Sequence, residues 1–366
     1  MPSERRRPWW GMLLLAAVLA VLPFATGLSL GPAWVRVLDF CLLYILLALG
    51  LNIVVGYAGL LDLGYVAFYA VGAYVYALLS SPHLTSHFPA LAAIFPNGIH
   101  APIWLLLPAG ALVAGLFGVL LGAPTLRLRG DYLAIVTLGF GEIIRIFINN
   151  LYQPVNITNG ALGITQIDPP RLGPLALDKG LSLFGLAVSS LHLYYYLFLA
   201  LALAVIFVSV RLEDSRIGRA WVAIREDEIA AKACGINTRN VKLLAFAMGA
   251  SFGGVAGGLF AGFQQFVSPE SFQLIDSIMI LCMVVLGGMG HIPGVIFGAI
   301  VLTVLPEAFR SGAGPLQNLL FGRVLVDPEA LRMLLFGLTL VAVMLYRPAG
   351  LWPEARRRRE FAAEPK

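Results

Sequence analysis

The chain has 366 residues, of which 59% are hydrophobic and only 12% are charged. A soluble domain of this size could not bury so much apolar surface, so the composition excludes a soluble globular protein and predicts an integral membrane protein. Lys and Arg number 25 against 20 Asp and Glu, and they cluster between apolar runs, which is typical of membrane topology rather than of a nucleic-acid-binding surface.

A membrane-spanning helix needs about 20 mostly apolar residues. By that measure the chain contains ten candidate spans, at residues 10–30, 34–55, 59–80, 102–123, 131–151, 190–211, 241–265, 275–290, 292–310 and 330–347. The basic start before the first span would also fit a cleaved signal peptide, but Trp9 and Trp10 favour a retained anchor, because Trp is enriched at membrane interfaces. We therefore expect an all-α polytopic membrane domain over residues 1–350 and a basic cytoplasmic tail over 351–366.

The distribution of positive charge predicts the orientation. If both ends are cytoplasmic, 18 of the 25 Lys and Arg lie in cytoplasmic segments and the opposite loops are poor in them. Five spans before the long outer loop at 152–189 and five after it would place the two halves in opposite orientations, which predicts an inverted repeat.

The segment from Arg211 to Lys242 is the most charged loop, and this topology places it in the cytoplasm. Small and apolar residues recur in it every three or four positions, which predicts a short amphipathic helix. They are Ala220, Ala223, Ile224, Ile229, Ala230, Ala233 and Cys234. Gly235 predicts the end of this helix, and Asn237 with Thr238 predicts the start of the next. A solvated connector is the alternative to a docking element for another protein.

Polar residues within the apolar runs are candidates for a solute path, because ionisable groups at membrane depth face a cavity or each other. Glu142 and Arg145, three residues apart, could form a structural pair instead. Asp62 and Asp131 could cap the helices that follow them. The glycine-rich runs either pack helices closely or expose backbone groups to a solute. The possible pathway or gating residues are Asn52, Gly59, Asp62, Gly64, Asp131, Thr137, Gly139, Glu142, Arg145, Gly288 and Gly290.

The sequence contains no phosphate-binding GxxxxGK[ST] run, no HExxH or GxSxG motif and no paired-cysteine metal spacing. The cysteines Cys41, Cys234 and Cys282 are far apart, and packing roles fit them best. We expect a chain that is not an enzyme and binds no metal or cofactor.

Residues 228–235, EIAAKACG, resemble the EAA loop of ABC importer permeases, although Ile229 separates Glu228 from the alanines where the usual pattern has Glu directly before them. Four further stretches are similar to the LivM-type permeases of branched-chain amino acid ABC transporters. They are LNIVVGYAGLLDLGYVAFYAVGAY (51–74), RGDYLAIVTLGFGEIIRIFINN (129–150), MVVLGGMGHIPGVIFGA (283–299) and LLFGLTLVAVMLYRPAGL (334–351). Two features depart from the family pattern. The segment TNGALGI (158–164) stands where the family often has Thr-Gly-Gly-Pro before Gly-Ile, and His291 stands where a small residue is more usual.

The resemblance implies a type II ABC importer permease in the bacterial inner membrane. Its implied partners are a second, LivH-type permease, two cytoplasmic ABC ATPases that use ATP and Mg²⁺, an extracytoplasmic solute-binding protein and membrane lipid, with no nucleic acid. The loop at 213–240 would be the coupling element that sits in a groove of the ATPase. Its expected contact residues are Arg225, Glu226, Asp227, Glu228, Ala230, Ala231, Lys232 and Gly235.

The expected solutes are leucine, isoleucine and valine. Related permeases move urea or other amides, so these solutes, or other amino acids, are the alternative within the same class. A gradient-driven secondary transporter, or a membrane scaffold or enzyme subunit, would be a protein of a different class; the transporter would need an intramembrane carboxylate as its coupling site.

Overall fold

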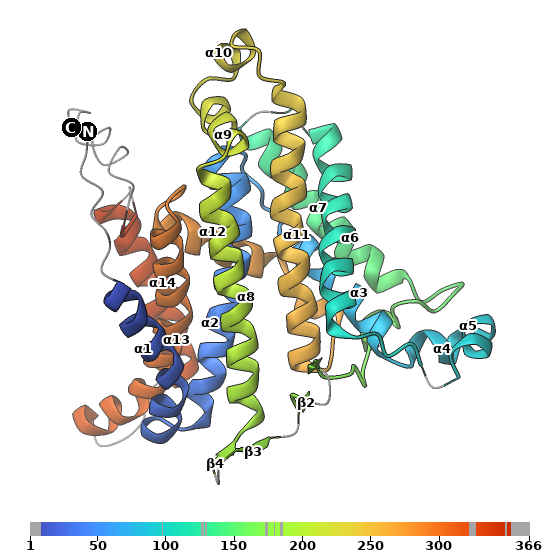
Figure 1. Ribbon diagram of the computed structural model, residues 1–366. Helices are drawn as coiled ribbons and strands as arrows, with labels where there is room; N and C mark the ends of the chain where they lie inside the picture. The colour runs from blue at the N-terminus through green and yellow to red at the C-terminus, as the bar shows by residue number, and fades with distance from the viewer. Residues whose placement is uncertain are drawn as a thin grey trace.

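The computed structural model describes residues 9–96, 98–125, 128, 130–172, 175–178, 180–183, 186–321, 327–347 and 350–352. Long helices run side by side through it, which confirms the all-helical class (Figure 1). The helices are α1 (Trp9–Ser29), α2 (Pro32–Leu51), η1 (Asn52–Tyr57), α3 (Val66–Ser80), α4 (His83–His87), α5 (Pro89–Ile94), α6 (Ile103–Thr125), α7 (Asp131–Asn150), η2 (Gly160–Leu162), α8 (Ser190–Glu213), α9 (Arg216–Glu226), α10 (Glu228–Ala233), α11 (Thr238–Gln264), η3 (Pro269–Ser271), α12 (Leu274–Gly287), α13 (Ile292–Phe321) and α14 (Pro328–Tyr346).

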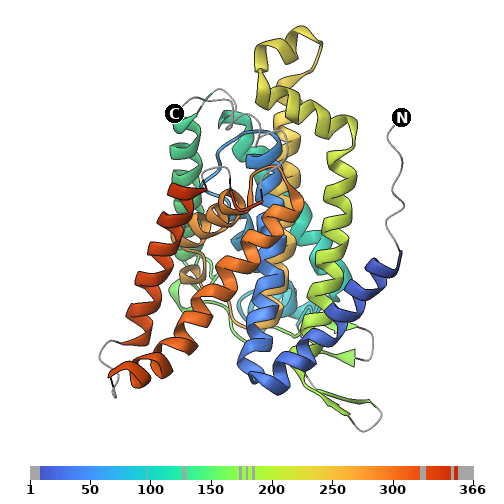
Figure 2. The same ribbon diagram turned by 90° about the vertical axis from the view of Figure 1, so that its left-hand side faces the viewer.

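Four very short strands form two antiparallel hairpins. β1 (Arg171–Leu172) pairs with β2 (Leu175–Ala176), and β3 (Leu181–Leu183) pairs with β4 (Leu186–Val188). The hairpin β3–β4 lies at one end of the helical bundle, and α9 with α10 projects from the other (Figures 1 and 2). We call these the hairpin end and the α10 end.

Each of the ten predicted segments is helical over most of its length. Six stretches of the described chain are long and apolar enough to cross a membrane, namely Pro32–Tyr57, Ile103–Thr125, Ser190–Glu213, Thr238–Gln264, Pro269–Gly287 and Ile292–Gly312. Helix α3 is shorter, and α7 carries three charged residues among its 20. The count of ten spans and the inverted repeat therefore stay predictions.

Helix α2 lies at the centre of the bundle. Its second half is apolar on every side and almost wholly buried, which is typical of a helix surrounded by other helices. It continues into η1, a π-helical turn in which the Ala58 amide donates to the Ile53 carbonyl at 3.2 Å. Such turns are rare and occur often at functional sites.

Helix α11 packs against α3 and α6, and glycines lie at the points where the helices cross. A Cβ added at Gly72 would lie 2.1 Å from the Gly254 carbonyl oxygen, and one at Gly254 would lie 2.5 Å from that of Gly110. Because small residues let membrane helices approach closely, these crossings form a tight core. The glycine-rich run in α11 therefore serves packing.

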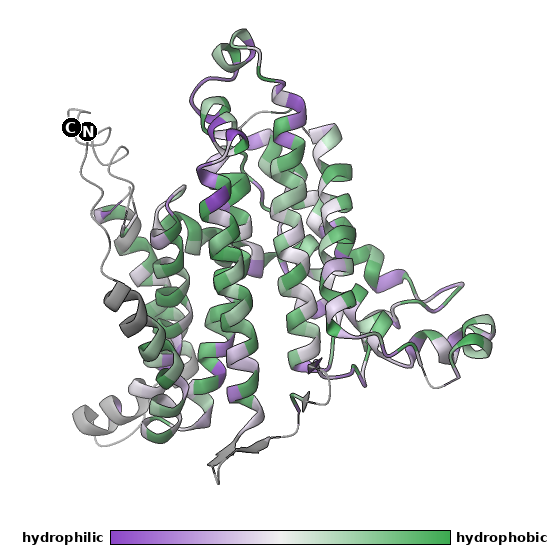
Figure 3. Ribbon diagram, viewed as in Figure 1, coloured by the Kyte–Doolittle hydropathy of each residue, from purple (hydrophilic) through white to green (hydrophobic). Residues whose placement is uncertain are grey.

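Hydrophobic residues cover the long helices, and hydrophilic ones gather at the α10 end (Figure 3). Much of the predicted orientation rests on basic residues that lie outside the described residues, so the orientation stays a prediction. These are Arg5, Arg6, Arg7, Arg127, Arg129, Arg356, Arg357, Arg358, Arg359 and Lys366.

Candidate functional site

Helix α9 is fixed to the bundle by one aromatic side chain. Trp221 is fully buried, and its indole Nε1 donates to the Val241 carbonyl in the first turns of α11 at 2.7 Å. Ser215 caps the helix by accepting from the Gly218 amide at 3.1 Å. A Cβ at Gly218 would lie 2.2 Å from the Leu212 carbonyl oxygen, so only glycine fits the turn that links α8 to α9. The projecting loop is therefore an ordered element.

Helix α10 begins at a capping aspartate. Asp227 has extended backbone, and its Oδ1 accepts from the amides of Ile229 at 2.7 Å and Ala230 at 3.1 Å. The sequence predicted one amphipathic helix through this region. That prediction was wrong, because a short polar side chain that satisfies the free amides favours a new helix start over continuation. Two helices, α9 and α10, take its place.

The other end of α10 is closed by the predicted glycine. Gly235 has φ +84°, which glycine adopts without strain, and its amide donates to the Lys232 carbonyl at 3.0 Å. The Ile236 amide donates to the Ala231 carbonyl at 3.1 Å, which completes a Schellman motif. Asn237 then caps α11 by accepting from the Asn240 amide. The predicted helix stop and start are both confirmed.

An ion pair joins α10 to α11. Lys242, whose side chain is only 8% exposed, contacts Glu228 at 2.7 Å, and Lys232 reaches the second oxygen of that carboxylate at 3.3 Å. The hydrogen bond from Lys242 lowers the pKa of Glu228, so this group stays ionised and paired at neutral pH. Asp227 and Glu228 therefore hold α10 in place, whereas the sequence predicted them as contacts for a partner.

The outward surface of α10 is small and apolar. Ile229 is 72% exposed, and Ala230, Ala233 and Cys234 are also exposed, whereas Ala231 turns inward and is buried. We call these four exposed residues the α10 face. The small and apolar residues that the sequence placed on one helix face are thus divided. Ile224 and Ala231 pack into the protein, whereas the α10 face is open to another surface. Glu226 is exposed beside it.

Arg225, predicted to contact a partner, points into the bundle instead. Its Nη1 donates to the Gly56 carbonyl in η1. A Cβ added at Gly59 would lie 2.8 Å from its side chain, and one at Gly290 would lie 3.1 Å from its Nη1. Arg225 therefore ties α9 to the π-helical turn and to the loop between α12 and α13.

Asn52 belongs to the same junction. It is 1% exposed, and its Oδ1 accepts from the Gly290 amide at 2.9 Å. Gly288 ends α12 with φ +116°, and Gly290 follows with φ +84°. We define the Arg225 junction as Asn52, Gly56, Gly59, Arg225 and Gly290. Four of these five residues were predicted as site residues, and the structure brings them together from four separate segments.

The irregular segment at 58–65 is the second place where predicted residues meet. Asp62 is fully buried, and its Oδ1 accepts from the Gly64 amide at 2.9 Å. Thr137 of α7 accepts from the Leu63 amide at 3.0 Å. Irregular backbone at membrane depth requires such partners because no water is present there. The segment is thus covered by protein, and Asp62 binds within its own loop rather than capping α3.

Ser277 was not predicted, yet it completes this arrangement. Its hydroxyl accepts from the Val66 amide at 3.0 Å, and it reaches α3 from α12. No sequence signal marks it, because one serine in an apolar run is common. Asp39 in α2 was also missed; it is fully buried, and neither of its carboxylate oxygens has a hydrogen-bond partner among the described residues.

Helix α7 carries a third group of predicted residues. Arg145 Nε donates to Glu142 at 3.0 Å, which confirms the structural pair, and its Nη1 also reaches Glu270 at 3.3 Å. Asp131 lies in the first turn of α7 but makes no side-chain cap, so that prediction was wrong; Gly130 occupies the cap position.

One side of α7 is open along its whole length. A Cβ added at Gly139 would have no atom of the described residues within 4 Å, apart from the backbone of its own helix. We call this side the open face of α7. Its exposed large residues are Tyr132, Ile135, Val136, Ile143, Ile146 and Phe147.

Comparison with known proteins agrees with this architecture. Residues 34–344 match the family model described as "Branched-chain amino acid transport system / permease component". The chain is 42% identical over 355 residues to the high-affinity branched-chain amino acid transport system permease protein LivM of Escherichia coli K12, covering 94% of this chain and 75% of that protein. LivM of Salmonella typhimurium is 40% identical over the same shares.

The same comparison finds a second kind of permease. LivH of Salmonella typhimurium, named for the same transport system, is 26% identical over 272 residues, 73% of this chain and 82% of LivH. No solved structure matches the chain. The family model covers most of the helical bundle, including α9, α10 and the Arg225 junction. The chain belongs to the family of permease components of branched-chain amino acid transport systems.

Proposed function

We propose that this chain is the transmembrane permease subunit of an ATP-driven importer for leucine, isoleucine and valine. It pairs with a LivH-type permease, binds two cytoplasmic ABC ATPases through the α10 end and receives solute from an extracytoplasmic binding protein. Both termini are cytoplasmic, and the partners rather than this chain use ATP and Mg²⁺. Family membership supports the solute class, because the relatives at 42% and 40% identity are named for branched-chain amino acid transport.

The structure of α10 is the observation that best supports the proposed ATPase contact. A short helix projects from the bundle, capped at both ends and tied down by Glu228, with small apolar residues facing outward (Figure 1). Exposed apolar surface held in a fixed geometry is typical of a helix that enters a groove on a partner. Ile229, in the first turn of α10, provides the largest side chain for that groove.

The Arg225 junction supplies a route from this contact to the membrane domain. A shift of α9 and α10 would act through the Arg225 guanidinium on the Gly56 carbonyl, and through Asn52 on the α12–α13 loop. A π-helical turn has a local hydrogen-bond pattern that can rearrange to that of an α-helix, so it is a suitable place for such a shift. We propose that Arg225 couples ATPase motion to η1.

The open face of α7 is the proposed wall of the solute path, at the boundary with the second permease. Glu142 and Arg145 are 40% and 29% exposed within a helix that is otherwise mostly apolar. Ionisable groups inside a membrane face other protein or a water-filled cavity rather than lipid. This side of α7 therefore needs a protein or aqueous neighbour in addition to Glu270, which reaches Arg145 from within this chain.

Gly139 allows a direct test of the path. The Cβ of a leucine at position 139 meets no atom within 4 Å in the part of the chain that the structure describes, outside its own helix, so the fold should tolerate it while the neighbouring space is filled. We expect Gly139→Leu to assemble with its partners and to lose most leucine uptake. Gly337→Leu on α14, where the added Cβ also meets nothing within 4 Å, is the matched control. Equal uptake by the two variants would refute the proposed path.

A further inference from the structure

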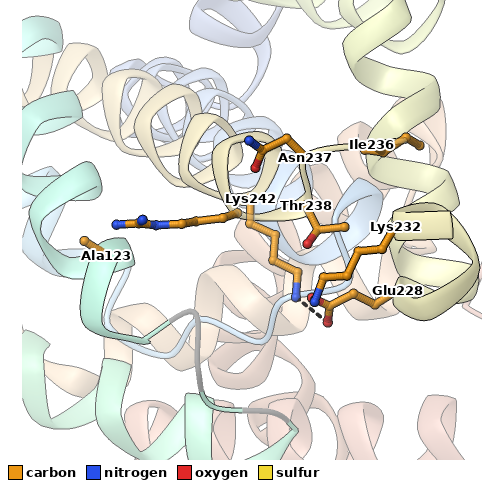
Figure 4. Close-up of a pocket in the computed structure, with 8 residues that line it drawn as sticks. Ala123, Glu228, Lys232, Ile236, Asn237, Thr238 and Lys242 are labelled. Carbon is orange, nitrogen blue, oxygen red and sulfur yellow. Dashed lines mark hydrogen bonds and ion pairs between the residues drawn. The ribbon is translucent and has the colours of Figure 1, made fainter. Parts of the chain in front are cut away.

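A basic cavity lies beneath α10 and is separate from the α10 face. It has a volume of about 480 Å³ and lies between α10, the first turns of α11 and the last turn of α6 (Figure 4). Its lining residues are Ala123, Glu228, Lys232, Ile236, Asn237, Thr238, Arg239 and Lys242. This volume is large enough for a phosphate group together with several waters.

The charges in this cavity are not balanced by the chain's lining residues. Lys232, Arg239 and Lys242 contribute three positive charges, whereas Glu228 is the one acidic side chain among the lining residues. Both lysine ammonium groups converge on that carboxylate, as Figure 4 shows, and Lys242 lies closer to it than Lys232. Two positive charges therefore remain in a partly enclosed space.

The position of the cavity indicates which anions can reach it. Two helices of membrane-spanning length, α6 and α11, have their ends here, so the cavity lies at the level where a membrane surface is expected. Basic residues just outside a membrane attract anionic headgroups, and ammonium and guanidinium groups form strong charge-assisted hydrogen bonds to phosphate oxygens.

We propose that this cavity binds a phosphate-bearing anion, either the headgroup of an anionic phospholipid or free phosphate. The anion contacts Arg239 and Lys232, and it draws Lys232 from Glu228 because their 3.3 Å contact is the longer of the two. Lys242 keeps its bond to Glu228, so α10 stays attached. The inference concerns this chain alone and does not depend on the proposed solute or on ATPase docking.

The test uses the purified full-length chain in nanodiscs with a fluorophore on Cys234. This cysteine is exposed and lies between the lining residues Lys232 and Ile236 in the sequence, Cys41 is buried, and a Cys282→Ala background removes the partly buried third cysteine. One arm uses phosphatidylcholine nanodiscs titrated with inorganic phosphate, against chloride at equal ionic strength. The other uses nanodiscs that contain phosphatidylglycerol, without free phosphate.

A saturable fluorescence change in either arm supports the proposal, and the arm in which it occurs identifies the source of the phosphate. Arg239→Gln should weaken the binding by about tenfold or more, because it removes a charge-assisted contact. Arg216→Gln, an equal charge change on α9 outside the cavity, should leave it unchanged. The proposal would be overturned if neither arm gave a saturable response or if both substitutions had an equal effect. A fluorescence change that appeared only after ATPase was added would also overturn it.

Discussion

Truncation of Ile229 is the sharpest perturbation of the proposed ATPase contact. Its side chain is 72% exposed and is the largest of the α10 face, so Ile229→Ala removes apolar surface that the fold does not use. Complete burial of an isoleucine side chain contributes about 1.5–3 kcal/mol. The exposed fraction therefore represents about 1–2 kcal/mol of docking free energy, which corresponds to about a 5- to 30-fold increase in Kd.

The assay is the affinity of the purified permease pair for its ATPase subunits in nanodiscs, measured by titration. Ile217→Ala is the matched control, because it removes the same atoms from α9, where the residue is 37% exposed. Thermal unfolding of Ile229→Ala should match that of the wild type, because its side chain is mostly exposed. An unchanged ATPase affinity for Ile229→Ala, or equal losses for the two variants, would refute docking through the α10 face.

Charge reversal at Asp227 or Glu228 would be a poorer test of the same contact. Asp227 provides the cap of α10, and Glu228 provides its ion pair with Lys242, so either reversal would also displace the helix. Loss of ATPase binding would then report on the folding of α10 rather than on its outward surface.

Four further predictions concern the supports of the site and the packing of the helices around it. Lys242→Met should destabilise the protein by about 1–3 kcal/mol, seen as a lower Tm, because it removes the shorter of Glu228's two ion pairs. The pKa of Glu228 is lowered, so the stability that its ion pair contributes is present above the ordinary pKa of Glu and is lost as the pH falls through the lowered pKa. The difference in Tm between the wild type and Glu228→Gln should therefore disappear at that low pH. A difference in Tm that stays constant with pH would contradict the pairing. Arg225→Gln should retain ATPase binding and lose most uptake through the weakened junction, and normal uptake would contradict its coupling role. Gly72→Val should prevent folding, seen as loss of monodisperse protein, because its Cβ would lie 2.1 Å from the Gly254 carbonyl oxygen.

Features that depend on nearby residues could be predicted from the sequence. Apolar runs located the helices, since their length and hydropathy are local properties, and Gly235 marked the end of α10 because the left-handed conformation favours glycine. The pair between Glu142 and Arg145 followed from helical spacing.

Features that depend on distant segments could not be predicted in this way. The direction of Arg225 is set by a carbonyl 169 residues away, at Gly56, and Val66 is bound by a serine 211 residues further along the chain. The break at Asp227 is local, but the periodicity of the alanines continues through it, so the pattern concealed the cap. Burial of one side of α10 then divided residues that the sequence placed on a single face.

Uptake of radiolabelled leucine tests the central claim most directly. The permease pair and its ATPases would be reconstituted into proteoliposomes and supplied with binding protein. We expect leucine accumulation that requires both this chain and ATP on the α10 side, with isoleucine and valine as competitors and urea without effect. Leucine uptake driven by an ion gradient without ATP, or ATP-driven uptake of urea in preference to leucine, would contradict it.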